Sequence, residues 1–269
     1  MPDLSGKLAL VTGASSGIGE AMARQLAAWQ CDLVLTARRQ DRLDALCADL
    51  AGRGVKVRAV REDLADPGGA ARLHAAVRAL GSIDILINNA GFGAYQSFAE
   101  TAWARHAELL QLNVLSLVEL THRFLPELLA RPGRTHILNV ASIAAFVSVP
   151  YFASYTGSKT FVLGFSESLA AELAATSLRV TCLCPGGTST EFSQVAGQTL
   201  GRTARAGMMS AERCAAIGLR GMLRGRRVVV PGGANKATQV LSRLMPRRLL
   251  GAAGARILGK PSPRALPSP

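Results

Sequence analysis

The sequence is poor in the residue types that bind metals or form disulfides. It contains five cysteines and four histidines in 269 residues. The histidines are scattered without the regular spacing of a metal site, so no metal-ligating residues are expected. The cysteines show no paired spacing either, which favours a reducing compartment. Cys182 and Cys184 lie in an apolar run, where two small core residues are a simpler interpretation than a redox pair.

Long uncharged apolar runs are also missing. No run approaches the ~20 residues that a membrane-spanning helix needs, so no span is expected. Residues 1–6 lead directly into a strand pattern, without the segments of a signal peptide. The expected location is therefore the cytoplasm, with peripheral membrane contact as an alternative for the basic end of the chain.

Acidic residues are absent from that end. All eighteen Asp and Glu residues lie at or before Glu212, whereas twelve Lys and Arg residues follow it and supply nearly all of the net charge of +13. No helix with polar base-contacting residues and no stacking aromatics accompany this basic segment. Nucleic acid is therefore not expected as a partner.

Apolar strand patterns alternate with amphipathic helix patterns along most of the chain. Strands are predicted at 7–12, 32–36, 55–60, 83–88, 136–141, 179–184 and 227–232. Helices are predicted at 17–29, 41–50, 67–80 (opened by Pro67), 103–130, 154–172 and 211–223. This alternation predicts an α/β fold, a Rossmann-type doubly wound parallel seven-stranded sheet with helices on both faces. The predicted domain covers residues 1–233.

A glycine-rich turn joins the first strand to the first helix. It contains Gly13, Ser15, Ser16, Gly17, Ile18 and Gly19. Glycines let backbone N–H groups approach a pyrophosphate at the positive N-terminus of a helix. The G-x-x-x-G-x-G spacing follows a first strand and opens a helix, and it therefore predicts a dinucleotide site rather than an ordinary tight turn.

The end of the second strand indicates which dinucleotide is bound. An acidic residue here would hold the ribose 2′-hydroxyl of NAD, but the chain has Ala37 followed by Arg38 and Arg39. Arginine binds a 2′-phosphate through charge-assisted hydrogen bonds, so the pattern favours NADP over NAD. The alternative is that both arginines are solvated residues at a helix entry.

Tyr155 and Lys159 are the central candidates for catalysis. Being four residues apart, they share one face of the helix that Ser154 is expected to cap. A neighbouring cation lowers the pKa of a tyrosine, which makes Tyr155 a candidate general acid or base. Ser142 follows the strand at 136–141, at the sheet edge where open α/β sheets bind ligands. The three side chains are expected to converge on one substrate oxygen.

Together these motifs resemble the short-chain dehydrogenase/reductase family, single-domain type. The matching residues occur in family order over about residues 5–190: Thr12-Gly13-x-x-x-Gly17-Ile18-Gly19, Asp63-Leu64, Asn88-Asn89-Ala90-Gly91, Asn113, Ser142, Tyr155-x-x-x-Lys159 and Pro185-Gly186.

The resemblance implies a role for each matched residue. The implied contacts to NADP(H) come from the glycine-rich turn, Arg38, Arg39, Asp63, Leu64, Asn89, Ala90, Gly91, Tyr155, Lys159, Pro185, Gly186 and Thr188. Asn113 is implied to position a water that links Lys159 to solvent. Some NADP-using relatives carry a basic residue where this chain has Ser16, which leaves the 2′-phosphate to Arg38, Arg39 and the serines.

The implied reaction is hydride transfer between the nicotinamide and a carbonyl carbon, while Ser142 bonds the carbonyl oxygen and Tyr155 donates the proton. The expected substrate is a hydrophobic ketone or a β-ketoacyl group, or the corresponding alcohol in reverse. Its apolar contacts would come from residues 146–152 and from a lid at about 188–210. A catalytically silent cofactor-binding protein is the alternative, and no altered Ser142, Tyr155 or Lys159 supports it.

The end of the chain is expected to form a basic amphipathic extension over 234–260 and a disordered tail over 261–269. Leu241, Leu244 and Met245 fall on one helical stripe among arginines. Such a helix suits an anionic membrane surface or a partner subunit of a homodimer or homotetramer. The alternative is that the stripe packs on its own domain.

Overall fold

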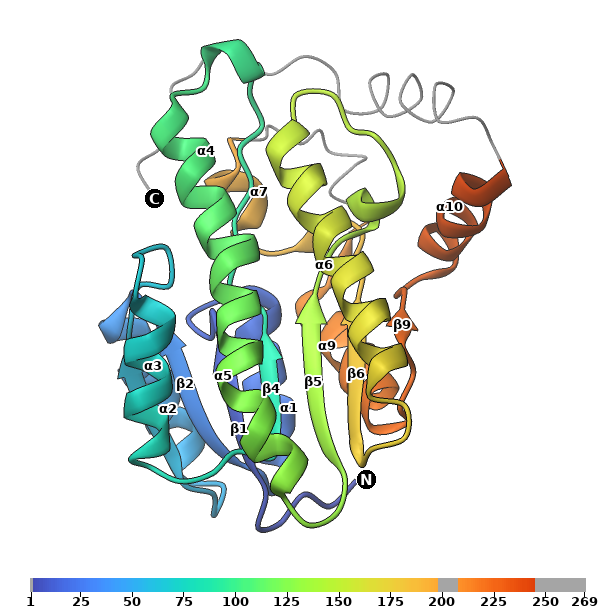
Figure 1. Cartoon of the computed structure of the whole chain (residues 1–269). Helices are drawn as coiled ribbons and strands as arrows, with labels where there is room; N and C mark the ends of the chain where they lie inside the picture. Colours follow the sequence, from blue (N-terminus) through green and yellow to red (C-terminus); the bar gives the residue numbers. More distant parts are fainter. Residues whose placement is uncertain (1, 198–207, 245–269) are drawn as a thin grey trace.

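Seven parallel strands form one sheet in the order β3-β2-β1-β4-β5-β6-β9 (Figure 1). The computed structural model describes residues 2–197 and 208–244. The strands of the sheet are β1 (Leu8–Thr12), β2 (Asp32–Ala37), β3 (Val57–Arg61), β4 (Ile85–Asn88), β5 (Thr135–Val140), β6 (Leu178–Leu183) and β9 (Val228–Val229). This arrangement confirms the predicted parallel, doubly wound sheet.

Helices cover both faces of the sheet, as predicted. One face carries α1 (Gly17–Ala28), α2 (Gln40–Ala51) and α9 (Ala211–Leu223). The other carries α3 (Gly69–Arg78), α4 (Trp103–Leu110), α5 (Ser116–Ala130) and α6 (Ala153–Glu172). Short helical turns lie at η1 (Phe98–Glu100) and η3 (Ile143–Phe146).

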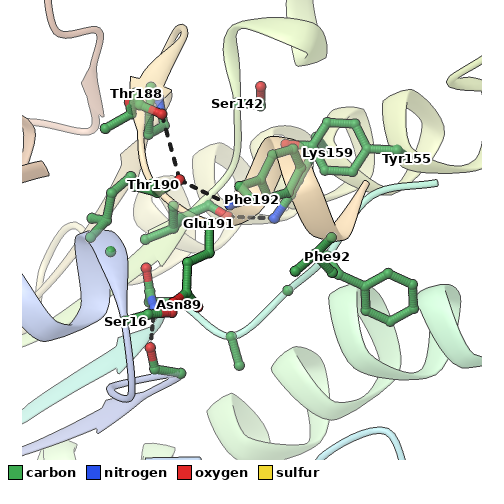
Figure 2. A pocket seen from close by; sticks show the side chains of 18 of the residues that line it. Ser16, Asn89, Phe92, Ser142, Tyr155, Lys159, Thr188, Thr190, Glu191 and Phe192 are labelled. Atoms are coloured by element: carbon green, nitrogen blue, oxygen red, sulfur yellow. Dashed lines mark hydrogen bonds between the residues drawn. The ribbon is translucent and has the colours of Figure 1, made fainter. Parts of the chain in front are cut away.

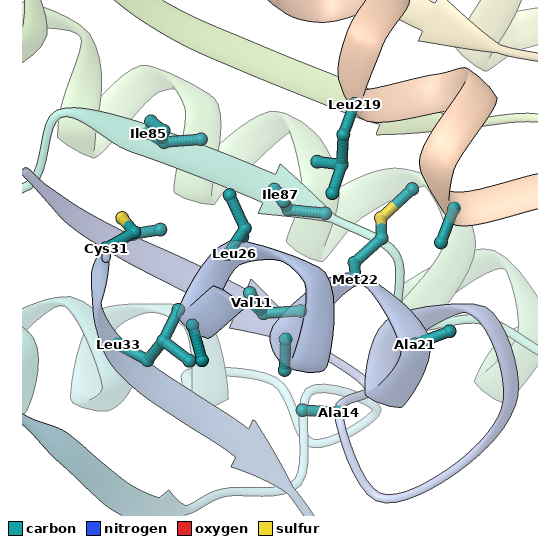
Figure 3. Packing of buried hydrophobic residues seen from close by; sticks show 14 of the residues in the cluster. Val11, Ala14, Ala21, Met22, Leu26, Cys31, Leu33, Ile85, Ile87 and Leu219 are labelled. Carbon is teal, nitrogen blue, oxygen red and sulfur yellow. The ribbon is translucent and has the colours of Figure 1, made fainter. Parts of the chain in front are cut away.

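The core explains why the strands are continuous apolar runs. Strands covered by helices on both faces must be apolar on both faces. In β1, Val11 packs in the layer beneath α1 and α9, whereas its neighbour Leu10 packs in the opposite layer. Figure 3 shows the first layer, in which Met22 and Leu26 of α1 lie with Leu219 of α9 over the sheet.

The strand order reverses between β1 and β4, and this reversal places the site. Crossovers run in opposite directions from this point, so a crevice opens at the carboxyl ends of the two strands. Thr12 of β1 is paired with Thr36 of β2, so the glycine-rich turn and the end of β2 leave the sheet at the same edge. Asn89 follows β4 at that edge and donates to the Thr12 carbonyl over 2.9 Å.

Several local predictions are wrong. Pro67 does not open a helix: α3 begins at Gly69, because Gly68 has a φ of 93°, which no helical residue adopts. Ser154 does not cap α6, which begins one residue earlier; its hydroxyl pairs with Nδ1 of His106 over 2.9 Å. The strand predicted at 227–232 pairs only at Val228–Val229.

The long helix predicted at 103–130 is interrupted. Between α4 and α5 lies a π-helical segment, η2 (Gln111–Leu115), which contains Asn113. A π-helical turn inserts extra backbone into a helix and often marks a functional position.

The end of the described chain forms a separate helix, α10 (Gly233–Leu244), at the edge of the molecule beside β9 (Figure 1). Its Leu241 and Leu244 are 48% and 76% exposed, so the described part of the chain leaves much of their apolar surface uncovered. Met245, the rest of the 234–260 extension and the tail at 261–269 lie outside the described residues. No helix within the described ranges is long and apolar enough to cross a membrane.

The predicted lid at 188–210 is described at its two ends. β7 (Thr188–Ser189) pairs with β8 (Met209–Ser210) in a small parallel sheet, and α7 (Phe192–Val195) follows β7. Residues 198–207 lie outside the described part of the chain.

Candidate active site

One cavity of about 1440 Å³ runs along the carboxyl edge of the sheet, from the glycine-rich turn to Tyr155. The predicted site residues that line it are Gly13, Ser15, Ser16, Gly17, Ile18, Arg38, Arg39, Asp63, Leu64, Asn89, Ala90, Gly91, Ser142, Tyr155, Lys159, Pro185, Gly186 and Thr188. Figure 2 shows Ser142, Tyr155 and Lys159 in one part of the cavity and Ser16 and Asn89 in another. Gly19 and Asn113 lie behind this lining.

The glycine-rich turn has the geometry of an anion cradle. Gly13 and Gly17 have φ values of 65° and 60°, which side-chain-bearing residues rarely adopt. A Cβ on Gly19 would lie 2.3 Å from the Gly13 carbonyl oxygen, so only glycine lets the turn fold this tightly onto α1. Ser16 precedes α1 without a side-chain capping bond, which leaves the N–H groups of the first turn available for an anion. These features fit a pyrophosphate.

A network of hydrogen bonds joins the segment after β4 to the glycine-rich turn. The Thr12 hydroxyl accepts from the backbone N–H groups of Asn89 and Ala90, at 2.9 and 3.0 Å. Gly91 then passes close to the catalytic candidates, since a Cβ there would lie 2.9 Å from Oδ1 of Asn113 and 3.4 Å from Nζ of Lys159. The backbone at Gly91 therefore forms a wall of the cavity that a side chain would obstruct.

The two arginines after β2 have different surroundings. Nη1 of Arg38 lies 3.9 Å from Oδ2 of Asp63 and 3.8 Å from Oε1 of Glu108, distances too long for hydrogen bonds. Arg39 instead points to the glycine-rich turn and the lid, where its Nη1 donates to Oε2 of Glu191 over 2.9 Å. Arg38 is therefore the arginine whose donors are less committed.

Tyr155 and Lys159 are both buried on α6, with exposed fractions of 7% and 4%. Nζ of Lys159 donates to the carbonyl of Val140 over 2.9 Å and lies 5.8 Å from the centre of the Tyr155 ring. Burial lowers the pKa of Lys159 to about 8. Burial also raises the pKa of Tyr155 to about 12, and a hydrogen bond with Ser142 acts in the opposite direction.

The prediction that Lys159 lowers the pKa of Tyr155 is therefore wrong for the protein alone. Removing a phenolate from water is costly, and this cost of burial outweighs the hydrogen bond with Ser142 that favours the phenolate. The consequence is that Tyr155 remains protonated at neutral pH, which is the state required of a proton donor.

Ser142 and Asn113 are held in place by the local backbone. Ser142 precedes the short helix η3, and its hydroxyl accepts from the N–H of Ala144 over 3.1 Å. The Asn113 amide bonds both the N–H and the carbonyl of Phe92, at 3.1 and 3.0 Å, and donates to the Ser158 hydroxyl over 3.1 Å. Asn113 therefore fixes the backbone next to the cavity without lining it.

The part of the cavity around Tyr155 is apolar. Its lining residues include Phe92, Ile143, Ala144, Val147, Val149, Phe152, Phe192, Val195 and Met208. The rings of Phe152 and Phe192 lie 4.8 and 5.3 Å from that of Tyr155. This lining agrees with the apolar pocket expected from residues 146–152 and the lid.

Several lining residues were not named from the sequence, and three of them bear on the shape and charge of the cavity. Thr190 and Glu191 belong to the lid, and Asn235 comes from α10. The Asn235 amide donates to the carbonyl of Pro231 over 2.7 Å and packs so closely on Gly186 that a Cβ there would lie 2.4 Å from it. Since none of the three belongs to a recognisable motif, only the fold reveals them.

Comparisons with known proteins agree with this geometry. A family model described as short chain dehydrogenase matches residues 7–201. The protein named dehydrogenase/reductase SDR family member 4 from Bos taurus is 38% identical over 197 residues, which are 71% of this chain and 69% of that protein.

Solved structures show the same fold. A short-chain dehydrogenase from Sphingobium yanoikuyae in complex with NADPH is 31% identical, with a TM-score of 0.78 over 90% of this chain and 97% of that one. A short chain dehydrogenase/reductase from Burkholderia phymatum in complex with NAD is 27% identical, with a TM-score of 0.80 over 90% of this chain and 94% of that one. The chain thus belongs to the short-chain dehydrogenase/reductase family of oxidoreductases.

Proposed function

We propose that this protein is an NADPH-dependent carbonyl reductase that acts on a hydrophobic ketone or β-ketoacyl substrate, or on the corresponding alcohol in reverse. One observation carries the proposal: a buried Tyr155 beside Ser142 lines the apolar end of a cavity whose other end is an anion cradle. Consumption of NADPH with a panel of ketones tests it.

The proposed mechanism assigns each side chain a separate task. When NADPH is bound, it would supply the hydride that the carbonyl carbon accepts. Ser142 and Tyr155 hydrogen-bond the carbonyl oxygen, and Tyr155 donates its proton as negative charge develops there. Lys159 provides a cation near the resulting phenolate, which would otherwise be unfavourable in so buried a place.

The proposed cofactor choice rests on the residues after β2. Ala37 offers no carboxylate to the ribose 2′-hydroxyl, and among the described residues the carboxylates nearest to Arg38 lie 3.8 and 3.9 Å away. A 2′-phosphate would give this guanidinium the bidentate partner that Asp63 and Glu108 do not provide at their present distances. The solved structures named above bind either dinucleotide, so the preference depends on this chain's own residues.

The pH profile offers a test of the roles of Lys159 and Tyr155. Lys159 has a pKa of about 8, so it carries its charge below that pH and loses it as the pH rises. Tyr155 stays protonated throughout this range because its pKa is about 12. We therefore expect kcat/KM for carbonyl reduction to fall as the pH rises through about 8.

The matched variant for this prediction is Lys159→Arg, since arginine keeps its charge at every accessible pH. The falling limb near pH 8 should disappear in this variant, whatever the absolute rate. A wild-type profile that stays flat well above pH 8, or a limb unchanged by the substitution, would contradict the proposed role of the cation.

We also propose that α10 contacts an anionic membrane surface. Val240, Leu241 and Leu244 are exposed, and the neighbouring charged residues, Lys236 and Arg243, are both basic. Apolar side chains flanked by cations suit the boundary between lipid headgroups and acyl chains. The chain beyond α10 adds further Lys and Arg and no acidic residue.

Replacing Leu241 and Leu244 by Gln should weaken sedimentation with anionic vesicles by at least ~10-fold, because each buried leucine side chain contributes about 1.5–3 kcal/mol. Trp103→Gln is the matched control, since Trp103 is 72% exposed on α4. Wild-type protein that ignores anionic vesicles at low salt, or a double variant that binds them as well as wild type, would reject the proposal.

A homodimer or homotetramer is the proposed assembly. Large apolar side chains are exposed on the helices of one face of the sheet, among them Trp103, Leu115 and Phe161. Sedimentation velocity of the Leu241/Leu244 double variant and of Trp103→Gln shows whether α10 or the face that carries Trp103 forms the subunit contact. If the Leu241/Leu244 double variant alone lowers the oligomeric state, the α10 stripe is a subunit contact instead of a membrane contact.

A further inference from the structure

A carboxylate of the lid, that of Glu191, is paired with Arg39, one of the two arginines proposed to bind the 2′-phosphate. Glu191 lies between β7 and α7, and its Oε2 accepts from Nη1 of Arg39 over 2.9 Å. Its Oε1 lies 3.7 Å from Nη2 of Arg42. The Arg39 guanidinium lowers the pKa of this carboxyl, and a hydrogen bond from Ser16 acts in the same direction. Glu191 is therefore held as an anion.

Arg39 is almost fully committed in this arrangement. Its Nη2 donates to the hydroxyls of Ser16 and Ser15, at 2.9 and 3.1 Å, and its Nε lies 3.3 Å from the Ser15 hydroxyl. With Nη1 bound to Glu191, all three nitrogens of the guanidinium have acceptors. Nη1 keeps one further N–H, so a phosphate that bonds it would lie next to the carboxylate of Glu191 and compete with it for the same nitrogen.

The carboxylate occupies a position that would also suit an anionic ligand. Arg39, Glu191 and the two serines all line the cavity at the end that holds the glycine-rich turn. Arg38 lies at the same end, and within residues 2–197 and 208–244 its nearest carboxylates are farther away than Glu191 is from Arg39. Glu191 thus neutralises Arg39, while Arg38 has no carboxylate as close among the described residues.

The strength of the Arg39–Glu191 ion pair distinguishes two possible roles. A strong pair would hold the lid over the cofactor, whereas a weak pair would yield Arg39 to a competing phosphate. The side chains of Arg39 and Glu191 are 43% and 38% exposed. Ion pairs this exposed change an equilibrium constant by about fivefold at most, so the pair is too weak to hold a lid closed over a cofactor. A dianionic phosphate forms stronger charge-assisted bonds to arginine and would repel a carboxylate left beside it. We therefore expect the phosphate to replace the Glu191 carboxylate on Arg39.

We propose that Glu191 is a specificity-determining residue that competes with the 2′-phosphate of NADP(H) for Arg39. The inference rests on the proposed use of NADP(H). A ligand with a 2′-phosphate displaces Glu191 and detaches the start of α7 from the turn after β2. A ligand without that phosphate leaves the Arg39–Glu191 pair intact. Glu191 thereby lowers the affinity for the phosphorylated cofactor and links the attachment of the lid to the identity of the cofactor.

The test compares binding of 2′,5′-ADP and 5′-AMP, two fragments that differ in the 2′-phosphate, by titration calorimetry. Glu191→Gln should bind 2′,5′-ADP about two- to fivefold more tightly than wild type, because the competing pair is a weak exposed one. Binding of 5′-AMP should change less than about twofold, since it does not engage Arg39. NADPH and NADH should show the same difference.

Two controls isolate the contact from the general effect of charge. Glu212 lies on the first turn of α9 and lines a second, smaller cavity together with Glu191 and Arg42. Within the described ranges it forms no ion pair with Arg39 or Arg42. Glu212→Gln removes the same charge and should leave the preference for 2′,5′-ADP unchanged. In an Arg39→Met background, Glu191→Gln should give no gain, because the group for which Glu191 competes is gone.

Three results would overturn the proposal. Weaker binding of both fragments by Glu191→Gln would identify the pair as a clasp that holds the cofactor. An equal gain for both fragments, shared by Glu212→Gln, would identify a long-range charge effect. Tighter binding of 2′,5′-ADP by Glu191→Gln in the Arg39→Met background would show that Glu191 does not compete for Arg39. Equal affinity of the unmutated protein for 2′,5′-ADP and 5′-AMP would contradict the proposed NADP(H) preference instead, and the response of Glu191→Gln would still decide the role of Glu191.

Discussion

Replacing Tyr155 by Phe should lower kcat for carbonyl reduction by at least ~100-fold, the lower end of what general acid catalysis contributes. The substitution removes only the hydroxyl that bonds Ser142 and is proposed to protonate the substrate oxygen. The ring remains packed between Phe152 and Phe192, so the fold and the affinity for NADPH should be nearly unchanged. Steady-state kinetics and fluorescence titration with NADPH measure the two quantities.

The matched control is Tyr151→Phe. Tyr151 lies near the same aromatic cluster but outside the cavity lining, so its hydroxyl should be dispensable. A Tyr155→Phe protein that keeps more than about a tenth of kcat would show that another group donates the proton. Loss of NADPH affinity together with kcat would show instead that Tyr155 is required for binding.

Replacing Arg38 by Ala should weaken NADPH binding by about 10- to 150-fold, which corresponds to the ~1.5–3 kcal/mol of a hydrogen bond to a charged group. NADH binding should change little, because only the phosphorylated ribose engages the guanidinium. Arg39→Ala should have a smaller effect, since that side chain must first release Glu191. Calorimetric titration with each dinucleotide measures these changes.

Arg58→Ala serves as the control, because Arg58 is an exposed residue of β3 outside the cavity and its loss changes only the net charge. Equal dissociation constants of the unmutated protein for NADPH and NADH would refute the proposed preference. An equal loss for both dinucleotides in Arg38→Ala would show that Arg38 contacts a part of the cofactor that they share.

The sequence was most informative where neighbouring residues decide the structure. The glycine-rich turn lies directly between a strand and a helix. The left-handed φ of Gly13 and the close approach of Gly19 to the Gly13 carbonyl are both local. Tyr155 and Lys159 share a helix face by their spacing alone. Ser142 ends up near them because the carboxyl ends of parallel strands meet at one edge of the sheet.

The sequence was least informative where distant segments meet. Glu108 and Glu191 approach the arginines after β2, and Asn235 packs on Gly186, although the partners in each contact are distant in the sequence. Their contacts depend on the path of the lid and of α10, which no local pattern specifies. The direction of the pKa shift of Tyr155 depends on burial, and burial is a property of the folded protein.

Helix boundaries failed for a related reason. The Ser154 hydroxyl is a suitable capping group, but His106 of α4 competes for it once the helices pack. Pro67 is suited to a first helical position, but the left-handed conformation of Gly68 delays the helix. In both places a tertiary contact or a backbone turn outweighed the local preference.

The most direct test of the proposed activity is to follow NADPH absorbance while the protein is mixed with ketones of equal size, either apolar or carrying a carboxylate. We expect an apolar ketone to oxidise NADPH with an equal amount of alcohol formed, and carboxylated analogues to react far more slowly. Tyr155→Phe should abolish the reaction. Tight binding of NADPH without turnover of any ketone, or of the corresponding alcohols with NADP, would contradict the claim that this site reduces a carbonyl.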